Sequence, residues 1–129
     1  MKLPDLADLD QACVLEYHGH ADAIEAAARH AKIRYLEVDL SRAEDRATLF
    51  SALASGLELP EYFGRNFDAL ADVLEDRDWI GKSGCAIRLA HAPHYRKTHP
   101  TDWRTLEDVL SEACAFWRDR RVPFWVLVG

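Results

Sequence analysis

Two aspartates one helical turn apart, Asp68 and Asp72, are the residues of this chain best placed to do chemistry. They lie in a segment whose apolar residues recur at helical spacing, so both carboxylates should project from the same side of a helix. Glu75 falls on that polar side, whereas Leu70 and Leu74 fall on the apolar one. Nothing within the helix neutralises the carboxylates. Paired acids of this kind serve as acid and base in a hydrolase or as contacts to a basic partner. The alternative is a solvent-exposed helix face with neither a catalytic nor a binding role.

A hydrolase that used Asp68 and Asp72 would need a concave site and further convergent catalytic groups. The sequence contains no Gly-x-Ser-x-Gly motif and no phosphate-cradling loop, and a surface helix is a poor setting for a glycosidase-like pair. We therefore expect a protein that is not an enzyme. His91, His94 and His99 share one expected loop, but no nearby cysteine or carboxylate completes a zinc pattern. We expect no metal and no cofactor.

The charge distribution favours a basic partner. The chain of 129 residues carries a net charge of −6 at pH 7, and the segment 58–78 alone contains seven acids and two bases. Such a balance argues against binding of nucleic acid, and no apolar run approaches the length of a membrane span. Tyr62 and Phe63 precede the acidic helix, and acids beside aromatic rings are typical of a protein contact surface.

The order of the elements predicts an α/β fold. Strand-like and helix-like segments alternate along the chain, which indicates a small, mostly parallel β-sheet flanked by α-helices. Asp22, Asn66 and the pair Ser41 and Glu44 match helix N-terminal patterns, and the segment with the histidines is expected to be a loop. The expected strands are 12–17, 33–40, 84–90 and 122–128, and the expected helices are 22–32, 41–54, 66–76 and 101–120.

The cysteines and the aromatic residues of the last third are expected to be structural. Cys13, Cys85 and Cys114 are far apart and lie in apolar segments, so free thiols in a reducing compartment are favoured over a disulfide or a metal site. Trp103 and Trp125 lie on apolar faces and are expected in the core. The sequence opens without a secretory pattern, so we expect a cytoplasmic protein.

Residues 59–72 read Leu-Pro-Glu-Tyr-Phe-Gly-Arg-Asn-Phe-Asp-Ala-Leu-Ala-Asp, and this run resembles the signature of the barstar family of barnase-type ribonuclease inhibitors. The order of the expected elements around the run is similar as well, so the resemblance covers about residues 33–129. It implies a barstar-like three-layer architecture. Residues 1–32 look like a strand and helix added to that core within a single domain over 1–129.

The resemblance also implies a function. A family member of this kind is an intracellular, immunity-type inhibitor whose acidic helix occludes the active site of a cognate basic ribonuclease or nuclease toxin in a 1:1 complex. It would be monomeric when free and would bind neither nucleic acid nor membrane. The alternative is an acidic protein-interaction module on the same fold that binds a basic partner other than a nuclease.

Site residues follow from the resemblance position by position. Asp68 and Asp72 match the two helix aspartates that enter the nuclease site, Tyr62 matches the interface tyrosine, and Gly64 and Asn66 shape the adjoining loop. The expected partner-binding residues are Tyr62, Phe63, Gly64, Asn66, Asp68, Asp72, Glu75, Asp76 and Trp79.

This chain departs from the barstar pattern at three places. Ala71 stands where barstar has a tryptophan between the helix aspartates. Trp79 corresponds to the later interface tryptophan only across a gap. No acid matches the one that barstar contributes from its next long helix, and Glu112 is the nearest candidate.

Overall fold

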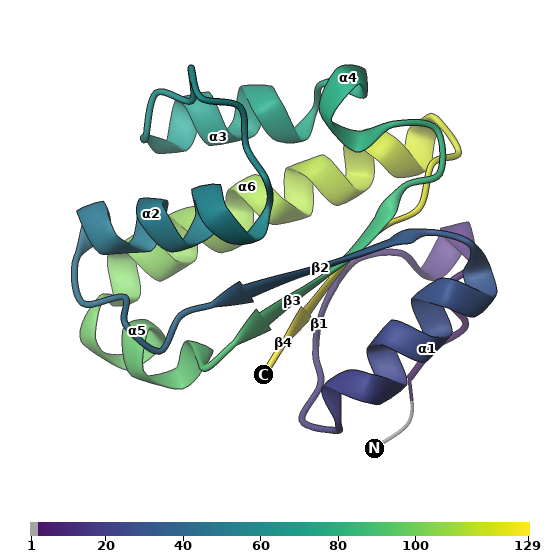
Figure 1. Cartoon of the computed structure of the whole chain (residues 1–129), viewed down its shortest axis with the longest axis horizontal. Helices are drawn as coiled ribbons and strands as arrows, with labels where there is room; N and C mark the ends of the chain where they lie inside the picture. Colours follow the sequence, from purple (N-terminus) through teal and green to yellow (C-terminus); the bar gives the residue numbers. More distant parts are fainter. Residues whose placement is uncertain (1–2) are drawn as a thin grey trace.

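The computed structural model describes residues 3–129, which form a four-stranded sheet and six α-helices (Figure 1). The strand order is β1-β4-β3-β2, and every pairing is parallel, which confirms the predicted sheet. The elements in chain order are a 3-10 helix η1 (Leu9–Gln11), β1 (Val14–Glu16), α1 (Ala21–Ala31), β2 (Arg34–Asp39), α2 (Arg46–Gly56), α3 (Phe67–Leu74), α4 (Arg77–Ile80), β3 (Cys85–Ala90), α5 (Ala92–Thr98), α6 (Pro100–Asp119) and β4 (Phe124–Val128).

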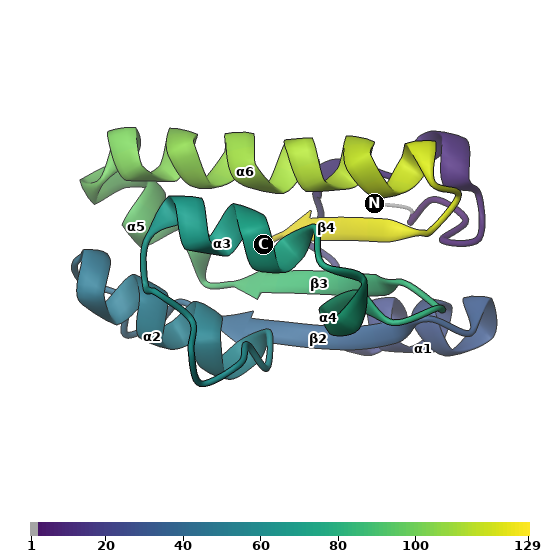
Figure 2. The ribbon, with the colours of Figure 1, turned by 90° about the horizontal axis from the view of Figure 1, so that it is seen from above.

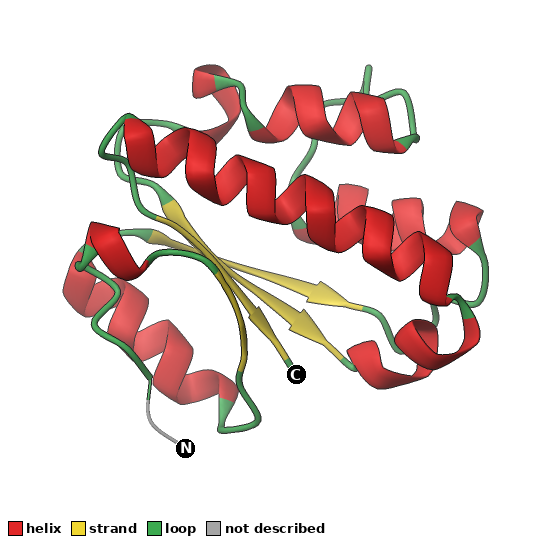
Figure 3. Ribbon diagram, turned by 180° about the vertical axis from the view of Figure 1, so that it is seen from behind, coloured by secondary structure: helices red, strands yellow, loops and turns green. Residues whose placement is uncertain are grey.

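Helices cover both faces of the sheet, which confirms the expected three layers. On one face, α1 packs against β2 and β3; on the other, α2 packs on β2 and α6 on β4 (Figures 1 and 2). The molecule seen from behind shows α6 between the sheet and α3 (Figure 3). Because α3 contacts α6 and lies outside it, its second face is open to solvent. No helix within residues 3–129 is long and apolar enough to cross a membrane.

The central strands are apolar because helices cover both of their faces. All five residues of β4 are buried, as its continuous apolar run predicts. The indole nitrogen of Trp125 donates a hydrogen bond to the Leu6 carbonyl at 2.9 Å, which ties the N-terminal segment to β4. Cys85 and Cys114 are buried and Cys13 is half-buried, and all three thiols are free, as expected.

Two predicted helix starts are wrong. The helix expected from Ser41 begins at Arg46, because Asp45 rather than Ser41 forms the N-cap. The Asp45 carboxylate accepts from the Thr48 backbone N–H at 2.8 Å, and the Thr48 hydroxyl accepts from the Asp45 N–H at 3.0 Å. These reciprocal bonds satisfy two otherwise unpaired helix donors. Asp22 lies in the first turn of α1, where His20 holds the N-cap position, so Asp22 does not cap that helix.

Two further segments differ from the prediction. The expected loop with the histidines contains α5, because Pro93 lies at the start of that helix and Pro100 at the start of α6, where proline needs no N–H donor. The helix expected over 66–76 ends at Leu74, because the Asp76 carboxylate accepts from the Asp78 N–H at 2.8 Å and caps a second short helix, α4. The chain therefore turns sharply directly after the acidic helix.

The packing of α1 gives a test of whether the first thirty residues fold with the rest. Ile24 is 1% exposed and lies in the same cluster as Ala28, Trp125 and Leu127. We expect Ile24→Ala to lower the free energy of unfolding by about 2–5 kcal/mol, because it leaves a cavity between α1 and the sheet. Denaturant unfolding should retain one transition.

The matched control is Ala23→Ser at the neighbouring exposed position, which should change stability by less than about 0.5 kcal/mol. The contrary result would be a separate early unfolding transition in the wild type or in Ile24→Ala, with a main transition that the substitution does not shift. It would show that the N-terminal layer folds independently of the sheet.

Candidate functional site

The direction of Asp68 and Asp72 follows from how α3 is anchored. Leu70 and Leu74 are fully buried in the core. The indole nitrogen of Trp117 on α6 donates a hydrogen bond to the Leu74 carbonyl at 2.7 Å, which fixes the last turn of α3. Both aspartates are exposed on the remaining face. The two carboxylates, i and i+4, therefore stand one turn apart on a helix held from beneath.

Asn66 fixes the first turn of α3. Its side-chain oxygen accepts from the Ala69 N–H at 2.7 Å, and its side-chain nitrogen donates to the Gly64 carbonyl at 3.2 Å. The predicted cap is therefore confirmed, and the same side chain joins the loop to the helix. Asp68 lies in this first turn, where the helix dipole favours a negative charge.

The loop before α3 is held in one conformation from both ends. Glu58 and Arg65 have φ angles of 54° and 52°, in the left-handed region that non-glycine residues seldom adopt. Such backbone persists only where the surroundings fix it. The Arg65 guanidinium donates to the Ser51 hydroxyl at 3.1 Å. At the tip of this loop Tyr62 is 78% exposed, so its ring is available to a partner.

Two of the expected contact residues are largely buried. The Phe63 ring is 7% exposed and lies 6.0 Å from the Phe50 ring, centroid to centroid. Trp79 is 8% exposed, and its indole nitrogen donates to the Leu57 carbonyl at 2.9 Å, because the turn of α4 directs the ring inward. The interpretation of Phe63 as a contact ring does not fit this burial. Trp79 keeps one accessible edge, which lines a pocket.

The carboxylates on and directly after α3 form no ion pair with the residues that the structure describes. Within residues 3–129, none of the ion pairs includes Asp68, Asp72 or Glu75. Partial burial raises the pKa of Glu75, the charges of Glu112 and Asp72 raise it further, and Arg120 opposes them. Glu112 lies on α6, the helix that packs against α3, and its charge acts on Glu75. We call Asp68, Asp72, Glu75 and Glu112 together the acidic face.

The sequence named Glu112 only as the acid nearest to an unmatched family position, and the packing of α6 against α3 brings its helix to this surface. Asp76, expected as a partner-binding residue, is half-buried and serves as the N-cap of α4. Gly64 is exposed in the loop, and its carbonyl accepts a hydrogen bond from the Asn66 side chain. The structure therefore groups the two α3 aspartates with Glu75 and Glu112, and it separates Phe63 from them.

The exposed carboxylates of Asp68 and Asp72 are suited to charge recognition. Asp68 and Asp72 line neither of the two pockets found beside the loop within residues 3–129. Across residues 3–129 no three His, Cys, Asp or Glu side chains are grouped so that they could hold a metal ion. Among the histidines, His99 stacks on Tyr95 with the ring centroids 4.5 Å apart, which is a packing role.

Repulsion among the carboxylates of the acidic face can be tested through the pH dependence of stability. Because the pKa of Glu75 is raised above its usual 4.5, its ionised form destabilises the fold at neutral pH. We expect Glu75→Gln to raise the melting temperature at pH 7. The gain should shrink as the pH falls through about 4.5, because the wild-type side chain then takes up its proton. Thermal unfolding at pH 7 and at pH 4 measures this.

Glu61→Gln, at an exposed loop position, is the matched control and should show no such gain. An unchanged or lower melting temperature for Glu75→Gln at pH 7 would contradict the repulsion.

A family model described as Barstar (barnase inhibitor) matches residues 33–129. None of the curated proteins searched matches the chain. The matched range begins one residue before β2, as the sequence predicts, and it contains the loop, α3 and α6 that build the acidic face. It leaves out β1 and α1.

Proposed function

The chain belongs to the barstar family, and on that premise we propose that it is an immunity-type protein that occludes the active site of a cognate ribonuclease with its acidic face. The family description, barnase inhibitor, supports a ribonuclease as the class of partner and an inhibitor rather than an enzyme. One observation carries the proposal. Asp68 and Asp72 lie exposed, one turn apart and without an ion-pair partner in residues 3–129, on a helix anchored in the core.

The proposed mechanism is electrostatic mimicry of the substrate. A ribonuclease active site binds phosphate groups with arginine, lysine and histidine side chains, and a carboxylate offers the same kind of acceptor oxygens to these donors. No bond is made or broken. The enzyme stops because its anion positions are filled.

Preorganisation supports tight binding by this route. The N-cap at Asn66 and the hydrogen bond from Trp117 to Leu74 fix both ends of α3 before a partner arrives. A carboxylate on a fixed helix loses little conformational freedom on binding, so less of the interaction energy is spent on ordering. The exposed ring of Tyr62 adds aromatic contact area at the edge of the acidic face.

The departures from the family pattern bear on the identity of the partner. Ala71, in the place of a tryptophan, is half-buried and adds little area between the aspartates. Glu112 supplies an acid from α6 whose charge acts on Glu75. We infer that the partner presents cations opposite both helices and needs no deep aromatic contact at the centre of α3.

The biological setting that we propose is protection of the producing cell from its own ribonuclease or from a competitor's nuclease toxin. The protein would then act in the cytoplasm as a 1:1 complex. Buried free thiols at Cys85 and Cys114 suit a reducing compartment.

Inhibition can be measured directly. Purified protein is titrated into a panel of barnase-type ribonucleases that cleave a fluorogenic RNA. We expect cleavage by at least one of them to fall linearly to an end point at one protein per enzyme. If no member of the panel is inhibited while the acidic face captures a basic protein without nuclease activity, the alternative role as a general interaction module holds instead.

Asp72 is the residue whose loss should show most. We expect Asp72→Ala to weaken inhibition about 30- to 150-fold, which corresponds to about 2–3 kcal/mol, because it leaves a cation of the enzyme without its charged acceptor. Stability should hardly change, since the Asp72 carboxylate has no ion pair to lose. The inhibition constant and thermal unfolding measure the two effects.

The control is Asp22→Ala on α1, an exposed aspartate on the opposite side of the sheet. It removes the same charge from the protein and should leave inhibition within about twofold of the wild type. Equal losses in the two variants would mean that only net charge matters and that the acidic face is not the contact.

A further inference from the structure

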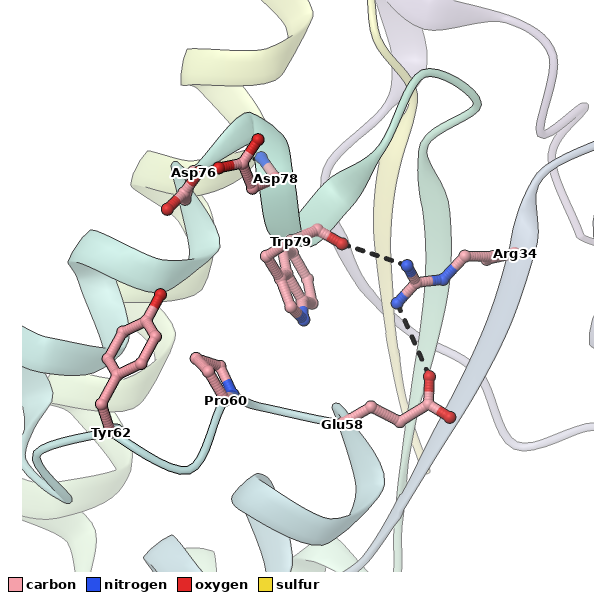
Figure 4. A pocket seen from close by; sticks show the side chains of 7 residues that line it. All are labelled: Arg34, Glu58, Pro60, Tyr62, Asp76, Asp78 and Trp79. Carbon is pink, nitrogen blue, oxygen red and sulfur yellow. Dashed lines mark hydrogen bonds and ion pairs between the residues drawn. The ribbon is translucent and has the colours of Figure 1, made fainter.

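A pocket of about 300 Å³ lies beside the acidic face, between the loop that carries Tyr62 and the short helix α4 (Figure 4). Arg34 and Glu58 form one side of it, and Asp76 and Asp78 lie on the other. The lining thus contains three carboxylates and a single guanidinium. Its volume is at the lower end of the roughly 300–1,000 Å³ of small-molecule sites, which suits one long side chain.

One wall of the pocket already holds a guanidinium. Arg34 donates from Nη1 to the Trp79 carbonyl at 3.0 Å, and its Nη2 lies 3.8 Å from the Glu58 carboxylate. The guanidinium carbon is 5.8 Å from the centroid of the Trp79 ring, within the range of a cation–π contact. A carbonyl, a carboxylate and an aromatic face thus recognise an arginine here. Because Glu58 pairs with Arg34, this wall is close to neutral.

The opposite wall has the same kinds of groups without the cation. No ion pair within residues 3–129 includes Asp76 or Asp78. One Asp76 oxygen caps α4, which leaves its second oxygen and the exposed Asp78 carboxylate free of such a bond. The Tyr62 ring borders the same space, and its hydroxyl points toward the side on which Asp76 lies (Figure 4).

The charge of the lining decides the class of occupant. An anion would meet three carboxylates, and an apolar group would desolvate Asp76 and Asp78 without replacing their hydrogen bonds to water. A guanidinium would offer a planar set of donors to the two carboxylates and could lie against the Tyr62 ring. Complementarity therefore favours arginine.

We propose that this pocket receives an arginine side chain of the ribonuclease that is bound at the acidic face. The arginine would bind between Tyr62 and the carboxylates of Asp76 and Asp78, across the pocket from Arg34. The identity of the partner rests on the proposed function, but the preference of the pocket for a guanidinium can be measured without the enzyme.

The first experiment is an NMR titration of the full-length, ¹⁵N-labelled protein with N-acetyl-arginine methylamide. The matched probe is the citrulline derivative, which has nearly the same shape and no charge. We expect saturable shifts of the backbone amides of Tyr62 and of Asp76, Asp78 and Trp79 with the arginine probe, and binding at least about tenfold weaker with citrulline. Absent shifts, or equal affinity for the two probes, would overturn the proposal.

The second experiment uses Asp76→Asn combined with Asp78→Asn. Asparagine caps a helix as well as aspartate does, so α4 should be retained while both charges are lost. We expect this variant to bind the arginine probe at least about tenfold more weakly. The control combines Asp22→Asn with Glu25→Gln on α1, across the sheet, and should bind the probe as the wild type does.

Inhibition assays with the same variants separate this proposal from the proposed function. If the wild type inhibits a ribonuclease and the Asp76→Asn, Asp78→Asn variant inhibits it equally well, the pocket receives no arginine of that enzyme and the acidic face remains the inhibitory contact. If the wild type binds the arginine probe but inhibits no ribonuclease, the pocket's preference stands, while the ribonuclease as its partner fails together with the proposed function.

Discussion

The burial of one face of α3 against α6 is the constraint on which the rest of the site depends. Leu70 and Leu74 must leave water, and the hydrogen bond from Trp117 to the Leu74 carbonyl fixes how far the helix can turn. Once that face is buried, Asp68 and Asp72 can only be outside. The Asn66 cap joins the loop with Tyr62 to the start of α3, and the Asp76 cap begins α4 directly after α3. The position of α3 therefore also sets the shape of the pocket between this loop and α4.

The segment around the anchored helix also concentrates acidic charge, of which the fold within residues 3–129 pairs only Glu58, with Arg34. The segment 58–78 holds a net −5 of the chain's −6, and Glu112 joins it from α6. Water and salt screen this repulsion while the face is exposed, so its cost in the free protein is modest. A cationic partner removes the repulsion and fills the acceptors. The same charges therefore weaken the free fold slightly and favour the complex.

The periodicity of apolar residues was enough to predict the sheet and α6, because buried strands and a long amphipathic helix repeat such residues over many positions. Ends were harder to predict. Ser41 with Glu44 and Asp45 with Thr48 both fit a capping pattern, and only the hydrogen bonds of the folded chain choose the second. The segment with the histidines, which contains Pro93, was expected to be a loop, although proline also fits the first turn of a helix such as α5.

Within the site, the local sequence was sufficient for Asp68, Asp72 and the Asn66 cap, whose positions depend on spacing along one helix. It was insufficient wherever distant segments meet. The inward turn of Trp79 depends on the carbonyl of Leu57, and Glu112 reaches the acidic face only because α6 packs under α3. The arginine-sized pocket likewise combines β2, the loop and α4, which no single stretch of sequence reveals.

Competition for the ribonuclease active site tests the central claim most directly. The affinity of the protein for an inhibited ribonuclease is measured at increasing concentrations of a mononucleotide that occupies the phosphate positions of that enzyme. If carboxylates of the acidic face fill those positions, the apparent dissociation constant should rise in proportion to the nucleotide concentration once the site is saturated. An apparent dissociation constant that stays unchanged, with nucleotide and protein bound to the enzyme together, would contradict the account.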